Sequence, residues 1–344
     1  TGGSLLNPYI FKSSSYIWTI GFLFFGLIYF DKITIEEKHL YIFLVAVLYI
    51  YYYSLYGIPE NLQEIILRFS DKFEYHKGSD LLIMFVSTFF IYNRVAKNKR
   101  FSMEVFLCFS AIYFPLLLFK SRGAFIAFVS FLLIEIIIYK KYLKTNFKRN
   151  ILLFILLIFL ILQSTFVVTK SGFLKFNEVD DKVKFVATYR AVPQEETRIL
   201  FIRDGRLYSA DGNLNWRFQI WQDVIDDLSI NNQLIMGYSF NEKIPAMDDP
   251  FRSGDDGTNE NVHNYFINIL ARGGMLHLSL IFYLYYFLIR KNILYSGNIH
   301  IFSLLIPCMI TSFFDASMEN SHFPLIFYFV FAISFNAKKL FQNY

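Results

Sequence analysis

The sequence is poor in charge and in cysteine, and it lacks the short motifs of many soluble enzymes. Of its 344 residues, 18% are charged and two are cysteine, whereas a soluble domain carries about 25% charged residues. Cys108 and Cys308 both lie inside apolar runs, which argues against a disulfide framework or a cysteine metal site. The phosphate-loop pattern, the dinucleotide pattern GxGxxG, the zinc pattern HExxH, the nucleophile pattern GxSxG and an Asp-x-Asp pair are absent. Chemistry driven by a bound nucleotide is therefore not expected.

Apolar and aromatic residues are in excess instead. Hydrophobic residues make up 55% of the chain and aromatic residues 20%, which is too much apolar surface for a water-soluble domain. We therefore predict an all-α polytopic membrane protein with about nine transmembrane helices. The nine apolar stretches near bilayer length are Tyr16–Phe30, Leu40–Tyr56, Leu81–Ala96, Met103–Phe119, Ala124–Tyr139, Ile151–Val168, Met275–Ile289, Ile301–Phe314 and Phe323–Phe335.

Basic residues mark one side of the membrane. They gather in every second connection between the apolar stretches, and such clusters face the cytoplasm. The clusters are Lys32 and Lys38; Arg94, Lys97, Lys99 and Arg100; Lys140, Lys141, Lys144, Lys148 and Arg149; Arg290 and Lys291; and Lys338 and Lys339. The remaining connections are predicted to be external, namely 1–15, 57–80, 120–123, 170–262 and 315–322. Because the chain starts with Thr1 on the external side, we expect one or more spans upstream of it.

The external segment 170–262 is far longer than the other connections and carries more acidic than basic residues. Strand-like runs at Lys184–Tyr189 and Arg198–Ser209, the latter with Asp204-Gly205 as a hairpin turn, indicate a small strand element. Asn215–Leu228 has the pattern of an amphipathic helix, and Met247–Asn261 that of an acidic flexible flap. The chain therefore divides into residues 1–169 with six transmembrane helices, a large external loop subdomain at 170–262, and residues 263–344 with an external helix and three further transmembrane helices.

Two arginines on the predicted external side indicate anion binding. Arg122 lies in the turn Lys120-Ser121-Arg122-Gly123 between two spans, where topology disfavours positive charge. An anionic headgroup would explain it, while the simpler alternative is a basic pair that reaches the membrane interface. Arg217 lies in the middle of an apolar helical arc, where an arginine is costly unless it is paired or binds an anion. We favour a functional Arg217 over one that bends out to water. The arc consists of Phe218, Ile220, Trp221, Val224, Ile225 and Leu228.

A histidine begins the segment that follows the large loop. On a helix, His263 shares a side with Phe266, Ile267 and Leu270, so it is predicted to point into the protein at the outer mouth of a span. A histidine titrates near neutral pH and is a natural general base, although a histidine at a helix start is more often structural. Gly273-Gly274 is expected to kink this helix.

Other ionisable residues have simpler explanations. Asp315, Glu319 and His322 lie in a short external connection, where exposed charges are expected. Glu135 precedes Lys140 by five residues and is expected to reach the cytoplasmic edge, without an assigned function.

The order of these features resembles the O-antigen ligase/polymerase superfamily (Wzy/WaaL-like proteins). In that family a Ser-Arg-Gly turn, a large external loop with an Arg…Trp helix, and a His-Asn pair at the next helix follow one another. The family pattern is His with Asn, Ser or Gln, then nine residues, Gly, two residues, and Gly, Thr or Tyr. His263-Asn264 and Gly274 match it, and His277 departs from it. Arg122 with Ile126 nearly meets an Arg-x-x-x-Leu element, and Asn7-Pro8 resembles the family's Asn-Pro element. The resemblance covers most of the chain.

The resemblance implies a GT-C-like, metal-independent glycosyltransferase that needs no cofactor. Its donor is a glycan on undecaprenyl pyrophosphate, its surroundings are the lipid bilayer, a chain-length regulator protein is a further candidate partner, and no nucleic acid is expected. Arg122 and Arg217 would hold the leaving pyrophosphate, because a guanidinium binds phosphate through two parallel hydrogen bonds. His263 would take the proton of the attacking sugar hydroxyl or help position the pyrophosphate. The further candidates for substrate binding are Arg272, Asn264, Tyr265, Trp221 and Asp315.

We predict a polymerase that joins repeat units of an O-antigen or capsular polysaccharide at the periplasmic face of the bacterial inner membrane. The same-class alternative is an O-antigen ligase or a protein O-oligosaccharyltransferase, and nothing in the sequence separates the acceptors. The non-enzyme alternative is a polysaccharide or anion transporter or flippase, in which the two arginines guide an anion. Transporters carry polar or broken helices near the bilayer midplane, whereas these spans have few charges there, so an enzyme of the outer face fits better.

Overall fold

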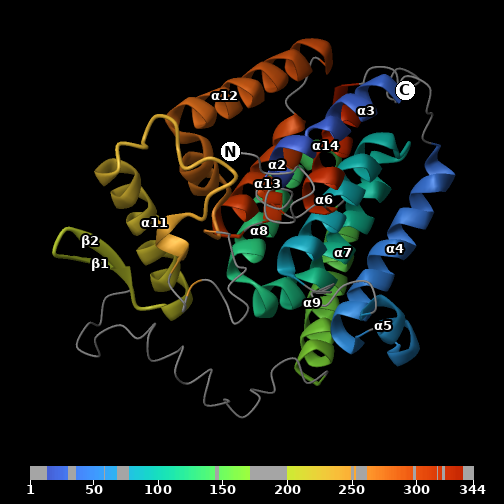
Figure 1. The fold of residues 1–344 in the computed structure, drawn as a ribbon. Coiled ribbons are helices and arrows are strands. Elements are labelled where there is room, and N and C mark those ends of the chain that lie inside the picture. Colours follow the sequence, from blue (N-terminus) through green and yellow to red (C-terminus); the bar gives the residue numbers. More distant parts are fainter. Residues whose placement is uncertain are drawn as a thin grey trace. The chain divides into compact units, whose positions relative to one another are not determined.

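The computed structural model describes residues 14–29, 36–57, 59–67, 77–143, 147–170, 200–248, 252, 262–296, 300–315, 317–319 and 322–335. Regular structure in these ranges consists of helices and one two-stranded hairpin (Figure 1). The α-helices are α2 (Ser15–Trp18), α3 (Gly21–Tyr29), α4 (Glu37–Tyr56), α5 (Glu60–Leu67), α6 (Gly78–Val95), α7 (Lys99–Lys120), α8 (Arg122–Leu143), α9 (Phe147–Lys170), α11 (Gly212–Ile230), α12 (Tyr265–Ser296), α13 (Ile301–Phe314) and α14 (His322–Phe335). The remaining elements are the strands β1 (Leu200–Arg203) and β2 (Arg206–Ser209) and the short 3₁₀ helices η2 (Pro245–Met247) and η3 (Ser317–Glu319).

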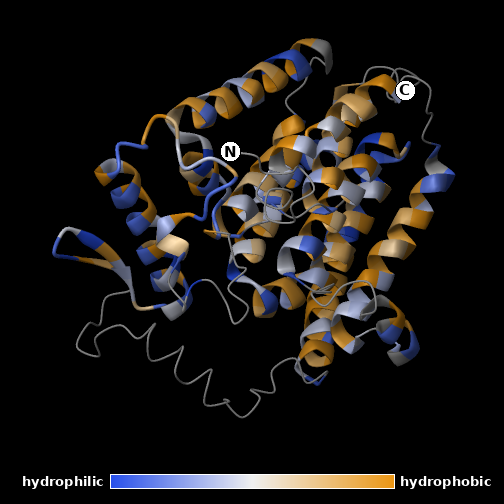
Figure 2. Cartoon of the chain, viewed as in Figure 1, coloured by the Kyte–Doolittle hydropathy of each residue, from blue (hydrophilic) through white to orange (hydrophobic). Residues whose placement is uncertain are grey.

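Five of the described helices are long and apolar enough to cross a membrane, namely α4, α7, α8, α9 and α12. Apolar residues cover most of α4 in Figure 2. The prediction of an all-α polytopic membrane protein is therefore confirmed. All nine predicted stretches overlap helices, but α13 and α14 have only 14 residues each and α3 has nine. The number of about nine spans stays a prediction.

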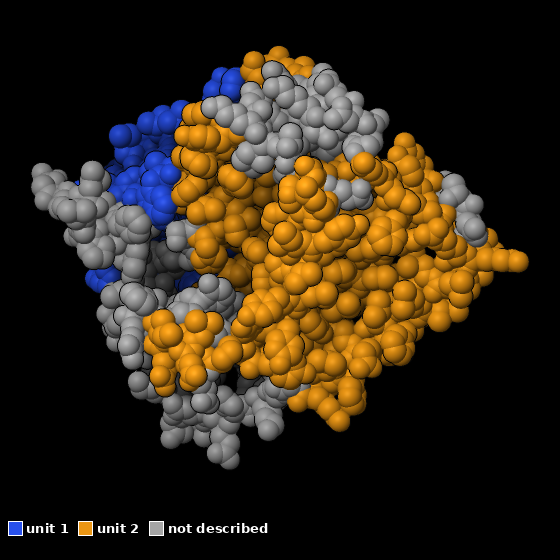
Figure 3. Space-filling view, turned by 90° about the vertical axis from the view of Figure 1, so that its right-hand side faces the viewer, with its two compact units in different colours: residues 1–18, 176–288, 312–320 blue, residues 19–175, 289–311, 321–344 orange. Residues whose placement is uncertain are grey.

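The chain forms two compact units (Figure 3). Unit 1 comprises residues 1–18, 176–288 and 312–320, and unit 2 comprises residues 19–175, 289–311 and 321–344. The transmembrane segment 1–169 and the external loop 170–262 remain predictions about topology.

Helix α6 is the centre of unit 2. It packs against α4, α7, α8 and α14, and almost all of its residues are buried. Its aromatic side chains form the core with rings from α7 and α8; the ring centroids of Phe85 and Phe128 are 5.2 Å apart and those of Phe89 and Phe106 are 5.3 Å apart. Helix α9 differs, because only Ser164 and Val168 are buried on it. An outer helix with so much exposed apolar surface is suited to a lipid environment.

A buried ion pair joins α6 to α8, and it corrects our expectation for Glu135. Glu135 does not reach an edge but is fully buried, and it accepts a hydrogen bond from Arg94 at 3.1 Å and from Asn93 at 2.8 Å. Arg94 also donates to Ser303 Oγ at 2.7 Å, so the network extends to α13. A buried charge is tolerated only with such partners, and here they fix the packing of three helices.

Reporter fusions test the predicted sidedness. Because basic clusters face the cytoplasm, fusions after Arg100, Arg149 and Lys291 should give a cytoplasmic signal, and fusions within 200–248 an external one. Paired phosphatase and fluorescent-protein reporters would measure both signs at each position. An external signal after Arg149 would contradict the orientation.

Candidate active site

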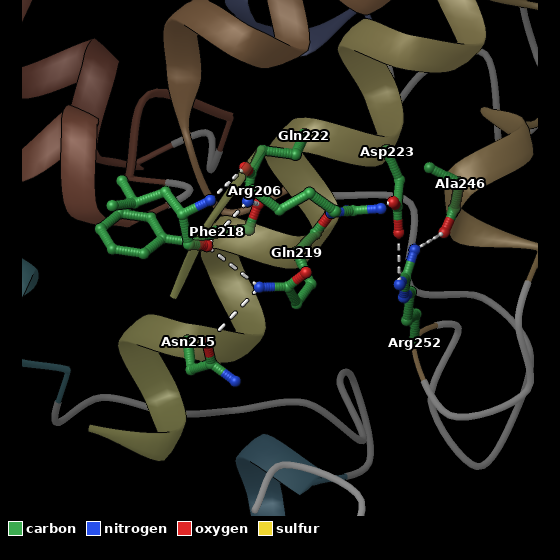
Figure 4. A network of polar contacts seen from close by, with 9 residues as sticks. Arg206, Asn215, Phe218, Gln219, Gln222, Asp223, Ala246 and Arg252 are labelled. Carbon is green, nitrogen blue, oxygen red and sulfur yellow. Dashed lines mark hydrogen bonds and ion pairs between the residues drawn. The ribbon is translucent and has the colours of Figure 1, made fainter. Parts of the chain in front are cut away.

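Residues of the β-hairpin contact the polar face of α11 (Figure 4). The hairpin turns at Asp204 and Gly205, both with positive φ, which confirms the predicted turn. Gln222 donates to the carbonyl oxygen of Leu207 at 2.9 Å and accepts from its N–H at 2.7 Å. Asp223 accepts from Arg252 at 2.6 Å and from Arg206, so the helix is held from one side along its middle turns.

The opposite face of α11 forms the core of unit 1. The helix is longer than predicted, and it begins after Asp211, whose carboxylate accepts from the N–H of Leu214 at 2.9 Å. Such a cap satisfies one of the free N–H groups of the first turn. The predicted arc is confirmed except for Ile225, which is 42% exposed. The buried residues of the arc are Ile220, Trp221, Val224 and Leu228, which pack with Val262, Leu270 and Ala271.

Arg217 lies on this apolar side and is half-buried. Its Nε atom is buried and finds no hydrogen-bond partner among the described residues. Burial lowers the pKa of its guanidinium, while the charges of Asp315 and Asp211 raise it. An arginine stays charged under such opposing effects. The site therefore holds a positive charge, and the Nε–H group of that arginine has no hydrogen-bond partner among the described residues.

The start of α12 meets α11 beside Arg217. The ring of His263 lies 5.0 Å from that of Trp216, centroid to centroid, and the indole N–H of Trp221 donates to the carbonyl oxygen of Val262 at 2.8 Å. His263 itself lies outside the helix, because α12 begins at Tyr265 and His263 has φ of +54°. The helical placement that we expected for His263 is therefore wrong. The contact of its ring with Trp216, rather than helical periodicity, positions the ring next to α11.

The other predicted substrate-binding residues of unit 1 make structural contacts. Asn264 caps α12, since its Oδ1 accepts from the N–H groups of Phe266 at 2.9 Å and Ile267 at 3.1 Å. Tyr265 is fully buried, and its hydroxyl lies 3.4 Å from that of Tyr285. Trp221 belongs to the core described above. Asp315 is half-buried. It is the best supported of these candidates, because its charge raises the pKa of Arg217.

Helix α12 is broken at Gly274, as predicted for Gly273-Gly274. A loop of unit 1 packs against this break. Gly274 has φ of 64° and ψ of −168°, so the helical hydrogen bonds stop there. Backbone groups of residues 234–239 replace them on both sides of the break. Tyr238 N donates to Ala271 O at 2.7 Å, Ser239 N to Arg272 O at 2.8 Å, Met275 N to Leu234 O at 2.9 Å and Leu276 N to Ile235 O at 3.3 Å.

Two glycines allow this close approach. A Cβ atom on Gly237 would lie 2.6 Å from the backbone of Arg272, and one on Gly274 would collide with the carbonyl of Ile235. Arg272, which is 1% exposed, donates to the carbonyl oxygens of Ser239 at 3.2 Å and Glu242. Its contacts hold the loop, and its proposed contact to substrate stays a prediction.

Replacing Gly274 by alanine should destabilise the protein strongly. The φ and ψ of Gly274 lie in a region open essentially to glycine alone, which costs another residue about 1–3 kcal/mol, and here the steric collision adds to that cost. Gly205→Ala is the matched control, because Gly205 also has positive φ but no atom lies within 4 Å of its added Cβ. Thermal unfolding of the purified variants measures the difference. Equal melting temperatures for the two variants would show that the loop does not clamp the break.

Arg122 lies in unit 2. It is the exposed first residue of α8, and the turn before it packs closely, since a Cβ on Gly78 would lie 2.6 Å from the Cβ of Ser121. Next to Gly78 on α6, Asp80 pairs with His322 of α14 at 2.6 Å. The side chain of His322 is 53% exposed, as expected, although it pairs with Asp80. Glu319, which we expected to be exposed, is only 7% exposed.

Comparison with protein families identifies the family of this chain. A family model described as O-antigen ligase matches residues 105–282. The chain belongs to the O-antigen ligase family. The matched range includes Arg122, Arg217, His263 and Gly274, so the resemblance drawn from the sequence is confirmed. Searches of curated proteins and of solved structures found no match.

Membership of the O-antigen ligase family makes the protein a multi-pass membrane enzyme of glycosyltransferase type that works on a lipid-linked glycan in a bilayer. Among the described residues, no three His, Cys, Asp or Glu side chains gather where they could hold a metal ion. The predicted strand at 184–189, most of the flap at 247–261 and Asn7-Pro8 lie outside the described residues.

One polar residue of this O-antigen ligase family member did not enter our sequence-based set of site residues. Asn268 is 2% exposed and lies one turn after Asn264 on α12. The spacing of four residues to Asn264 and again to Arg272 predicts three polar side chains on one side of a helix, but from the sequence we assigned Asn268 no role.

Proposed function

We propose that the protein is a polymerase that extends a glycan carried on undecaprenyl pyrophosphate, at the outer face of the bacterial inner membrane. The observation that carries this proposal is the contact between Trp216 and His263. It brings an imidazole to the segment of α11 that holds Arg217, a half-buried cation with unused hydrogen-bonding capacity. A base and a phosphate-binding cation are the two groups that transfer from a lipid pyrophosphate requires.

In the proposed reaction a sugar hydroxyl of the acceptor attacks the anomeric carbon of the donor glycan. A new carbon–oxygen bond forms, the bond from that carbon to the pyrophosphate breaks, and the pyrophosphate leaves with the bonding electrons. His263 accepts the hydroxyl proton. Arg217 stabilises the negative charge on the leaving pyrophosphate, and no metal ion is invoked. The phosphate-binding role of Arg122, which lies in unit 2, stays a separate prediction. Asp315 keeps the Arg217 side chain in place through their mutual attraction.

An O-antigen ligase is the second candidate, because the matching family model carries that description. The two activities share the donor and the leaving group and differ only in the acceptor. The polymerase adds the glycan to another lipid-linked repeat unit, whereas the ligase adds it to lipid A core or to a protein.

Cells that make the lipid-linked repeat unit but lack both an endogenous polymerase and the lipid A core acceptor separate the two activities. We expect expression of the protein to give a ladder of lengthened glycans on undecaprenyl pyrophosphate, detected on gels after lipid extraction. A ligase would give no ladder in these cells and would modify lipid A core once that acceptor is restored. That second pattern would contradict the polymerase.

A further inference from the structure

A polar stripe of three buried residues starts at the cap of α12 and continues over the first two turns of the helix. Asn264, Asn268 and Arg272 follow one another at intervals of four residues. Asn264 caps the helix, its carbonyl oxygen accepts from the N–H of Asn268 at 2.9 Å, and Asn268 and Arg272 share one helix face. All three are buried, with 0%, 2% and 1% of their surface exposed. Three buried polar side chains are costly unless each has hydrogen-bond partners.

The two ends of the stripe have structural tasks, and the middle has none. Asn264 uses its Oδ1 to cap the helix, and Arg272 binds the carbonyl groups of the loop. Asn268 is different, because its buried Oδ1 has no hydrogen-bond partner among the described residues. The same holds for the Nδ2 atom of Asn264, whose amide orientation is fixed by the two cap bonds. One free donor and one free acceptor thus lie a single turn apart.

This pair of groups selects the kind of ligand. A phosphate oxygen would use the donor but leave the acceptor of Asn268 unpaired, and a cation would do the reverse. A hydroxyl group serves both, since it accepts one hydrogen bond and donates another. Sugars carry several hydroxyl groups, and their discrimination depends on buried partners of this type.

We propose that Asn264 and Asn268 form a sugar subsite that binds one hydroxyl group of the lipid-linked glycan, a role that rests on the proposed function. The hydroxyl accepts from Asn264 Nδ2 and donates to Asn268 Oδ1. His263, directly before Asn264, and Arg217, at the contact with α11, belong to the same unit, so sugar and phosphate recognition share one region.

Stability measurements on matched variants distinguish a ligand-binding asparagine from a structural one. Asn292, further along α12, is also 1% exposed, but its Nδ2 donates to Ser334 Oγ at 2.6 Å. Asn268→Leu removes an unpaired polar group, so its melting temperature should equal or exceed that of the wild type. Asn292→Leu leaves Ser334 unpaired and should melt lower. A lower melting temperature for Asn268→Leu would overturn the proposal, because it would show that Asn268 has a structural partner.

Binding measurements then separate the sugar subsite from the pyrophosphate site. The two probes are undecaprenyl pyrophosphate without a sugar and lipid-linked glycan extracted from cells that lack this protein. Asn268→Leu should bind the glycan-bearing lipid roughly tenfold more weakly, as expected for one lost hydrogen bond, and the sugarless lipid as the wild type does. Asn264→Ser, which keeps the helix cap, should show the same selective loss.

The possible outcomes assign failure to one proposal or the other. Wild-type binding of both lipids by Asn268→Leu, or equal loss for both, would overturn the sugar subsite. Arg217→Lys should weaken the binding of both lipids alike. If Arg217→Lys binds both lipids as the wild type does, the pyrophosphate site of the proposed function is wrong, whatever the asparagine variants show.

Discussion

Replacing His263 with alanine is expected to abolish glycan elongation while the protein still inserts and accumulates. A positioned general base contributes about 10²–10⁴-fold to a rate, and alanine cannot accept the hydroxyl proton. The core of unit 1 should survive the change, because it is formed by Trp221, Val262 and their neighbours rather than by the imidazole. Chain-length distributions on gels, at matched protein levels, measure the effect.

The control for this variant is His39→Ala. His39 lies in the first turn of α4, where its Nδ1 accepts from the N–H of Glu36 at 3.3 Å on an exposed surface, and its loss should leave elongation intact. Near-normal chain assembly by His263→Ala would show that the base is another group. Asp315, whose charge acts on Arg217, and the buried Glu319 would then be the next residues to replace.

Lysine should replace neither Arg217 nor Arg122. A lysine keeps the charge but loses the planar fork that binds phosphate through two hydrogen bonds. One charge-assisted hydrogen bond contributes ~1.5–3 kcal/mol, so each Arg→Lys variant should lose roughly ten- to a hundredfold in turnover. The Arg217 variant has a second handicap, because its site is half-buried and an ammonium group is desolvated there at higher cost.

Arg203→Lys is the matched control for the arginines. Its side chain is 63% exposed on the hairpin, so the substitution should be neutral. Arg252 is unsuitable for this purpose, since its side chain is only 13% exposed and pairs with Asp223. Full activity in both Arg217→Lys and Arg122→Lys would show that the arginines supply only general interfacial charge.

Local signals in the sequence predicted several parts of this structure. The Asp204-Gly205 turn, the amphipathic helix around Arg217 and the break at Gly274 all depend on residues within a few positions of each other. Turn residues, a helical repeat and a glycine determine such features with little help from the rest of the chain. The buried arc of α11 therefore followed from the sequence, as did the half-buried position of Arg217 on it.

Long-range partners were not predictable in the same way. Glu135 was expected at the membrane edge because its nearest positive neighbour in sequence is Lys140, but its actual partner is Arg94 on α6. The loop that packs at the break in α12 comes from residues 234–239. No local sequence pattern predicts its backbone hydrogen bonds to the helix. The position of His263 was not predictable for a related reason, because its contact with Trp216 is tertiary. A single sequence contains no direct record of which distant residues meet.

Reconstitution of the purified protein in liposomes with lipid-linked glycan tests the central claim, that the protein transfers a glycan from a lipid pyrophosphate. The readouts are the release of undecaprenyl pyrophosphate and the length of the glycan that remains on lipid. We predict that the two rise together with wild-type protein, and that Arg217→Lys slows both by roughly ten- to a hundredfold. Glycan that crosses the bilayer at unchanged length, with no undecaprenyl pyrophosphate released, would contradict the account and identify a transporter instead.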